Sequence, residues 1–132
     1  MSELSEKNKK LYVELKELDD QIKKLNSHLE TLDEQLSDIN TSKLVISKFT
    51  ELKHGDELRV PLTSGIYIKA ELKDTKKVMV NVGANVTVEK TPAEVTEILD
   101  TQINELNAFR ESLVSNMKQL IARIEEIQKQ FK

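Results

Sequence analysis

The sequence predicts an α+β fold: two long helices paired as an antiparallel coiled coil, with two β-hairpins between them in the chain. Three observations predict this fold. Apolar residues recur at alternating spacings of four and three in the first and last thirds of the 132 residues. In the middle third the apolar period becomes two, and turn residues interrupt it. Charged residues make up 33% of the chain and aromatic residues 4%, which suits long helices and leaves little material for a large globular core.

The first apolar stripe predicts a helix over residues 1–54. All but one of its positions are apolar. They are Leu4, Asn8, Leu11, Leu15, Leu18, Ile22, Leu25, Leu29, Leu32, Leu36 and Ile39. Beyond the last of these the spacing breaks, and we expect Val45, Phe49 and Leu52 to continue the stripe after a shift. Gly55 suits the position that follows a helix C-terminus, because glycine tolerates the left-handed conformation found there.

The second stripe predicts a helix over residues 91–132. Its positions are Leu99, Ile103, Leu106, Arg110, Leu113, Met117, Leu120, Ile124, Ile127 and Phe131. Thr91, Pro92 and Glu94 form a helix start, with a capping side chain, a proline in the first turn and a carboxylate that completes a capping box. A period of 3.5 keeps a stripe facing one partner only if the two helices supercoil.

Two polar residues, Asn8 and Arg110, occupy positions of the apolar stripes. One interpretation is that they fix the register or the choice of partner. For Asn8 the alternative is that the helix ends splay apart, so that its side chain is in water. The sequence leaves both interpretations open.

Residues 57–90 predict four short strands, arranged as two successive hairpins with one apolar face. Pro61 marks an edge strand or a bulge, since proline cannot donate to a sheet ladder. Isolated hairpins are marginally stable in water, and the paired helices already fill their own seam. We therefore expect other subunits to complete the sheet. The predicted oligomerisation residues are Val60, Leu62, Ile66, Ile68, Val78, Val80, Val82, Val86 and Val88.

Composition and motifs argue against several function classes. The net charge is −3, whereas a nucleic-acid binder usually carries a basic surface. No apolar run reaches the ~20 residues of a membrane span. There is no cysteine, and no phosphate loop, zinc-protease or nucleophile-elbow motif. His28 and His54 lack obvious ligand partners. The sequence thus predicts a cytoplasmic protein that is not an enzyme and uses no metal or cofactor.

The hairpin segments carry a family resemblance. Residues 59–72 (RVPLTSGIYIKAEL) and 77–90 (KVMVNVGANVTVEK) are similar to the two hairpins of alpha-class archaeal prefoldin subunits. The order helix, paired hairpins, helix resembles prefoldin over the whole chain. Asn85 departs from the second glycine often seen in the turn of the second hairpin.

The resemblance implies an ATP-independent holdase. Two alpha-type subunits would associate through their hairpins into a β-barrel platform and recruit four beta-type subunits, giving a heterohexamer. Unfolded client proteins would bind at the far ends of the coiled coils and pass to a group II chaperonin.

The free ends of an antiparallel helix pair lie together, so the sequence also predicts where clients bind. The predicted client-binding residues are Leu4, Leu11, Tyr12, Val13, Leu15, Ile121, Ile124, Ile127 and Phe131. Tyr12, Val13 and Ile121 lie outside the stripes, so the apolar surface at the ends is wider than helix pairing requires. Two alternatives remain: a structural coiled-coil scaffold, and a self-assembling, filament-forming relative.

Overall fold

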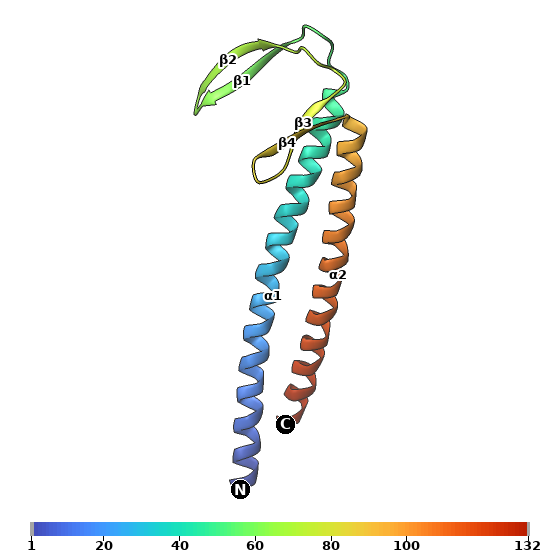
Figure 1. Ribbon diagram of the computed structural model, residues 1–132. Helices are drawn as coiled ribbons and strands as arrows, with labels where there is room; N and C mark the ends of the chain where they lie inside the picture. The colour runs from blue at the N-terminus through green and yellow to red at the C-terminus, as the bar shows by residue number, and fades with distance from the viewer. Residues whose placement is uncertain (1, 132) are drawn as a thin grey trace. The chain divides into compact units, whose positions relative to one another are not determined.

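The computed structural model describes residues 2–131, and the side chains from residue 6 onward. Two long helices enclose two hairpins in the chain (Figure 1), which confirms the predicted fold. The elements are α1 (Ser2–Phe49), β1 (Glu57–Thr63), β2 (Ile66–Glu71), β3 (Val78–Gly83), β4 (Val86–Lys90) and α2 (Pro92–Gln130).

The chain packs as two compact units. One combines residues 1–37 with residues 104–132, and the other comprises residues 38–103. Each unit therefore contains part of both helices.

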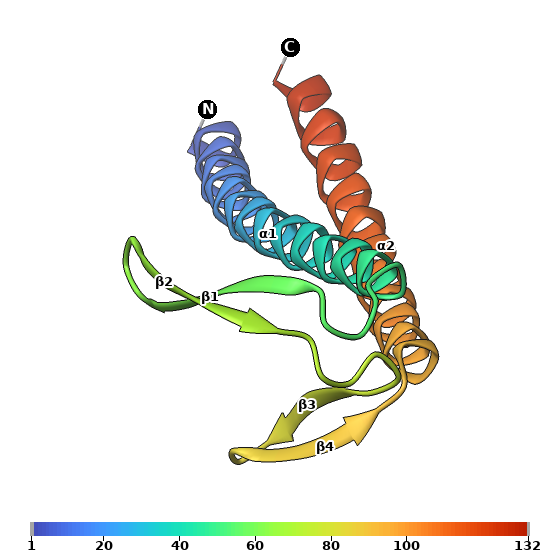
Figure 2. The same ribbon diagram turned by 90° about the horizontal axis from the view of Figure 1, so that it is seen from above.

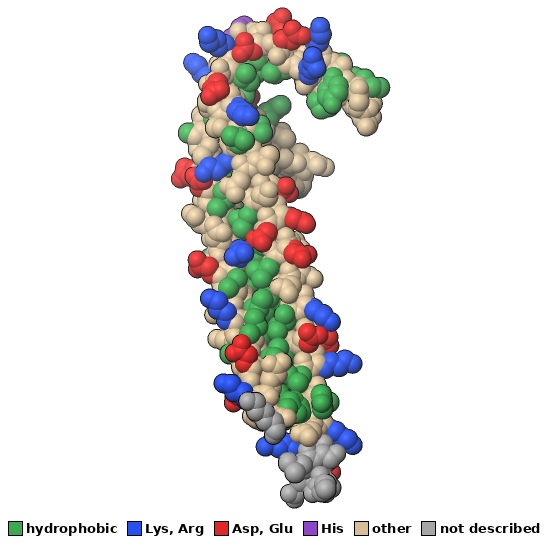
Figure 3. Space-filling model, turned by 180° about the vertical axis from the view of Figure 1, so that it is seen from behind, with side chains coloured by type: hydrophobic (Ala, Val, Ile, Leu, Met, Phe, Trp, Pro, Cys, Tyr) green, Lys and Arg blue, Asp and Glu red, His purple; other side chains and the backbone are tan. Residues whose placement is uncertain are grey.

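In the first unit the predicted stripes form the contact between α1 and α2. Leu11, Leu18 and Ile127 form a buried cluster. The partly buried residues packed against it are Leu15, Leu120, Ile124 and Phe131. Leu32 and Leu113 are also buried. Figure 3 shows hydrophobic side chains gathered in a line along the helices.

Three details of the first predicted helix are wrong. The helix ends at Phe49 rather than at residue 54, and Gly55 belongs to the base of the first hairpin, where its N–H donates to the carbonyl of Leu72 at 2.8 Å. The stripe continues through Ile46; of the three residues predicted to carry it on, Val45 is 59% exposed, whereas Phe49 and Leu52 are half-buried. Lys43 keeps the spacing intact, because it is half-buried at the next position of the stripe and its Nζ lies 2.6 Å from Asp100 Oδ1 of α2.

The predicted capping box starts α2. The Glu94 N–H donates to Thr91 Oγ1 at 3.2 Å, and the Thr91 hydroxyl donates to Glu94 Oε1 at 3.1 Å. The Thr91 hydroxyl, and after it the Thr91 backbone N–H, which donates to Glu94 Oε1 at 3.4 Å, hold the pKa of Glu94 below its ordinary value. The helix start therefore lies where the sequence predicts it.

The strands pair as two separate antiparallel sheets, β1 with β2 and β3 with β4. Figure 2 shows them as two distinct ribbons. In the first hairpin Val60 lies opposite Ile68, and the register shifts between Pro61 and Thr63, so the proline marks both an edge strand and a bulge. The second hairpin turns through Ala84 and Asn85, whose φ angles are 51° and 61°. Positive φ at both central residues is typical of a type I′ turn.

Candidate functional site

The predicted client-binding residues divide into a buried and an exposed set. Leu11 and Ile127 are buried, and Leu15, Ile124 and Phe131 are partly buried in the same cluster. Tyr12 is 64% exposed, Val13 59% and Ile121 43%. We call these last three residues the terminal patch. The side chain of Leu4 lies outside the described residues.

A ring contact and an ion pair join the two helices in this region. The ring centroids of Tyr12 and Phe131 are 4.9 Å apart. Arg123 of α2 donates to both carboxylate oxygens of Glu14, from Nε at 2.7 Å and from Nη2 at 3.2 Å. The hydrogen bond from Arg123 is the largest cause that lowers the pKa of Glu14. The ends of the helices are thus paired even though the terminal patch stays in water.

The hairpins expose most of the predicted oligomerisation residues. Six of them are exposed by 39–63%: Val60, Leu62, Ile66, Ile68, Val82 and Val86. Val78, Val80 and Val88 are half-buried. Tyr67 and Met79 are also exposed, by 59% and 77%, and the sequence prediction missed them. In the predicted strands both residues lie on the face opposite the apolar one, so the period-two pattern did not predict that they take part in assembly.

The polar seam residues take different places. Asn8 is exposed, which fits the interpretation that its side chain is wet. Arg110 is half-buried and its Nε donates to Asp33 Oδ1 of α1 at 2.9 Å. Arg110 therefore satisfies its charge with a specific partner across the helix pair, as expected of a residue that fixes register.

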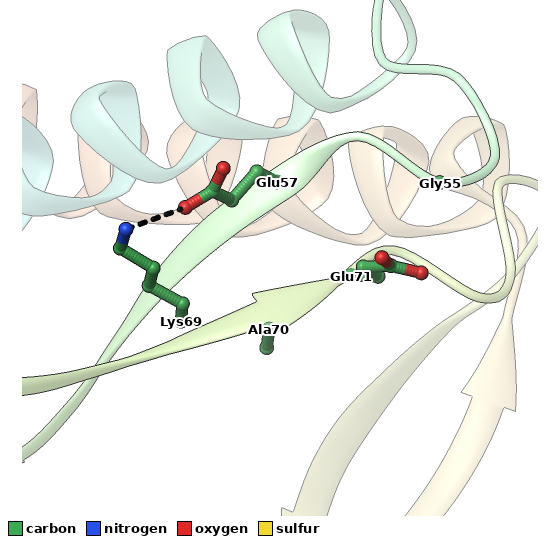
Figure 4. Close-up of a pocket in the computed structure, with 5 residues that line it drawn as sticks. All are labelled: Gly55, Glu57, Lys69, Ala70 and Glu71. Carbon is green, nitrogen blue, oxygen red and sulfur yellow. Dashed lines mark ion pairs between the residues drawn. The ribbon is translucent and has the colours of Figure 1, made fainter.

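Pockets in the described part of the chain are open to solvent; one at the first hairpin is mainly polar, and one on the helix pair, beside Leu25 and Leu120, is mainly apolar. Figure 4 shows the one at the base of the first hairpin, where Lys69 Nζ lies 3.7 Å from Glu57 Oε1 and the short side chain of Ala70 points away from this ion pair. Both His28 and His54 are exposed. Among the described residues no group of three or more His, Asp or Glu side chains could hold a metal ion. None of the described helices has the length and apolarity needed to cross a bilayer.

Comparison with known proteins points to one family. The sequence model of the prefoldin subunit family matches residues 18–132. A prefoldin subunit alpha from Thermofilum pendens is 33% identical over 85 residues, which cover 64% of this chain and 66% of that protein. A prefoldin subunit alpha from Methanococcoides burtonii is 38% identical over 69 residues, covering 52% of this chain and 50% of its own length. The matched segments thus span between half and two thirds of these relatives.

A solved structure shares the fold. The cryo-EM structure of filamentous PFD from Methanocaldococcus jannaschii superimposes with a TM-score of 0.79 at 24% identity, covering 90% of this chain and 98% of that one. Both chains therefore have the same arrangement of helices and hairpins.

Proposed function

The chain belongs to the prefoldin family, and from this premise we propose that it is a subunit of an ATP-independent chaperone that holds unfolded proteins. Members of this family are non-enzymatic chaperones. The observation that carries the proposal is the terminal patch: three apolar side chains that remain 43–64% exposed near a paired helix end.

Helix pairing accounts for only part of the terminal patch, through the contact of the Tyr12 ring with Phe131. Leu11, Leu15 and Ile127 fill the contact between the helices, whereas Val13 and Ile121 remain largely exposed. Exposed apolar side chains that gather in one region of a protein surface usually mark an interaction site. Because unfolded chains expose apolar segments of many kinds, exposed apolar side chains suit a binder of unfolded proteins. The patch, with the adjoining predicted residues, is the proposed client-binding site.

Assembly through the hairpins completes the proposal. The exposed valine, leucine and isoleucine side chains of β1–β4 suit burial between subunits, and both sheets have only two strands. We propose that two copies associate through these strands, recruit four beta-type prefoldin subunits, and pass clients to a group II chaperonin in the cytoplasm. These partners follow from the family resemblance.

A matched pair of variants tests the terminal patch. One carries Tyr12→Ser, Val13→Ser and Ile121→Ser. The control carries Leu44→Ser, Val45→Ser and Phe109→Ser, whose side chains are equally exposed at 55%, 59% and 53%. Suppression of the aggregation of several unrelated unfolded proteins is measured by light scattering at equal oligomer concentration. We expect the first variant to lose most of the suppression and the control to keep it. Equal suppression by both variants would show that clients bind elsewhere.

A filament-forming or scaffold subunit is the second candidate. The similar M. jannaschii structure is of a filamentous PFD, and the open sheet edges of this chain are compatible with repeated addition of subunits. Electron microscopy of the chain alone distinguishes the candidates, because a scaffold would form filaments while leaving client aggregation unchanged.

A further inference from the structure

The backbone groups of β2 alternate between its neighbour and open water. The Leu72 N–H donates to the Asp56 carbonyl at 2.9 Å, and the Leu72 carbonyl accepts from Gly55 at 2.8 Å, so Leu72 faces β1. Backbone direction alternates along a strand, which places Ala70 and Ile68 toward β1 as well. The N–H and C=O groups of Tyr67, Lys69 and Glu71 therefore point to the other edge. Within the described residues β2 has no neighbour on that edge.

The outer edge of β1 is a poorer acceptor of a new strand. Pro61 lies opposite Tyr67, so its backbone groups also point away from the β1–β2 ladder. The N–H that proline lacks is therefore missing from the outer edge of β1. The bulge after Pro61 interrupts that edge further. The edge of β2 contains neither a proline nor a register shift among its outward groups. The first hairpin can therefore be extended more readily at β2 than at β1.

The charges of the first hairpin are poorly matched within it. Glu57 lies directly opposite Glu71, and Arg59 lies directly opposite Lys69. Like charges directly opposite each other destabilise a strand pair. The diagonal contact between Lys69 and Glu57 is 3.7 Å long and both side chains are largely exposed, so it compensates only weakly. Lys69 and Glu71 thus lack a directly opposite charge partner in their own hairpin.

We propose that the outer edge of β2 pairs antiparallel with β2 of a second copy of this chain, with Ala70 opposite Ala70 on the two-fold axis. In this register Lys69 lies opposite Glu71 of the second copy, twice. Both residues present outward backbone groups, so the ladder hydrogen bonds form at these positions. On the other face of the strands Ile68 lies opposite Leu72 of the second copy. The inference deepens the proposed function, because it names the partner and register of the hairpin assembly.

Neighbouring registers are worse. If one strand is shifted by two residues relative to the other, Lys69 lies opposite Lys69 of the second copy for one direction of shift, and Glu71 lies opposite Glu71 for the other. Both arrangements place like charges opposite each other. Sliding by one residue sets outward backbone groups against inward ones, which breaks the ladder. The pairing is isologous and closes at two copies, so this edge produces a dimer rather than a filament.

A single cysteine tests the register, since the chain has no cysteine of its own. Residue 70 would form a non-hydrogen-bonded pair with itself, with Cα atoms ~4.5 Å apart, within the range of a disulfide. Ala70→Cys should therefore form a disulfide-linked dimer under mild oxidation. In the control, Ile68→Cys, the two cysteines would lie about 13 Å apart, at ~3.3 Å per residue over a four-residue offset. Equal cross-linking of the two variants, or none in Ala70→Cys, would overturn the register.

Charge exchange gives an independent readout by analytical ultracentrifugation of the full chain. Lys69→Glu and Glu71→Lys should each weaken dimerisation at least tenfold, and the double exchange should restore it. Unchanged dimerisation in both single variants overturns the proposal, as does a wild-type chain that is monomeric at micromolar concentration. Loss of client protection in a chain that still cross-links at residue 70 would refute the chaperone function and leave the strand pairing intact.

Discussion

Arg123 and Glu14 form a bidentate ion pair across the two helices, with Nε and Nη2 of the arginine on different oxygens of one carboxylate. Both side chains are a little over one third exposed, and the arginine also contacts Glu126 at 3.3 Å on its own helix. The pair lies in the unit that contains the cluster of Leu11, Leu18 and Ile127. It fixes the relative register of the helix ends, because a planar fork matches a carboxylate in one geometry.

We expect Arg123→Lys to lower the thermal midpoint of unfolding by a few degrees, although the positive charge is kept. Lysine offers a single point charge and cannot reproduce the fork. Circular dichroism of Arg123→Lys, Glu14→Gln and the double variant gives the coupling between the two residues. Lys118→Ala, at an exposed position of the same helix, is the control. Additive effects in the double variant would show that the pair contributes no coupling.

Acid should weaken the contact between the two helices at Glu14. The hydrogen bond from Arg123 lowers the folded-state pKa of Glu14 from its ordinary value of 4.5. A carboxylate with a depressed folded pKa contributes stability above its unfolded pKa, and this contribution is lost as the pH falls through the folded value. The unfolding midpoint should therefore fall as the pH decreases below about 4.5. In Glu14→Gln this part of the pH dependence should be absent.

Two isoleucines of α2, Ile121 and Ile127, should have different effects, one on client binding and the other on stability. Ile127 is fully buried, so Ile127→Ala should cost about 2–5 kcal/mol in the free energy of unfolding. Ile121 is 43% exposed, and Ile121→Ala should change stability by no more than about 0.5 kcal/mol while weakening aggregation suppression. Urea denaturation and the light-scattering assay measure the two effects. A large stability loss in Ile121→Ala would contradict its assignment to the terminal patch.

The second hairpin should gain from a better turn residue at position 84. Ala84 has a φ of 51°, a region that costs an ordinary L-residue roughly 1–2 kcal/mol. Asparagine tolerates this region and is preferred in type I′ turns. Ala84→Asn should therefore slow hydrogen exchange of the β3 and β4 amides, by up to about tenfold for ~1.4 kcal/mol. Ala84→Val is the control: a β-branched residue there should accelerate exchange.

The sequence by itself determined the two helices and the four strands. Their periods of 3.5 and two reflect which side of each element contacts a partner, and a partner-facing stripe is visible without coordinates. The helix start at Thr91 was equally legible, because a capping box uses residues three positions apart. The hairpin segments also carried the family resemblance.

Only the tertiary structure decided how far each apolar side chain is covered. The stripe already set Tyr12 apart from its neighbour Leu11, but only the structure shows that Tyr12 stays 64% exposed although its ring contacts Phe131. The same holds for Lys43, which keeps the stripe in register through its partner Asp100, where the sequence suggested a shift toward Val45. The hydrogen bond between Leu72 and Asp56 shows that the backbone groups of Lys69 and Glu71 point to the outer edge of β2. The sequence pattern of a strand shows which side chains share a face, but not which backbone groups point to which edge.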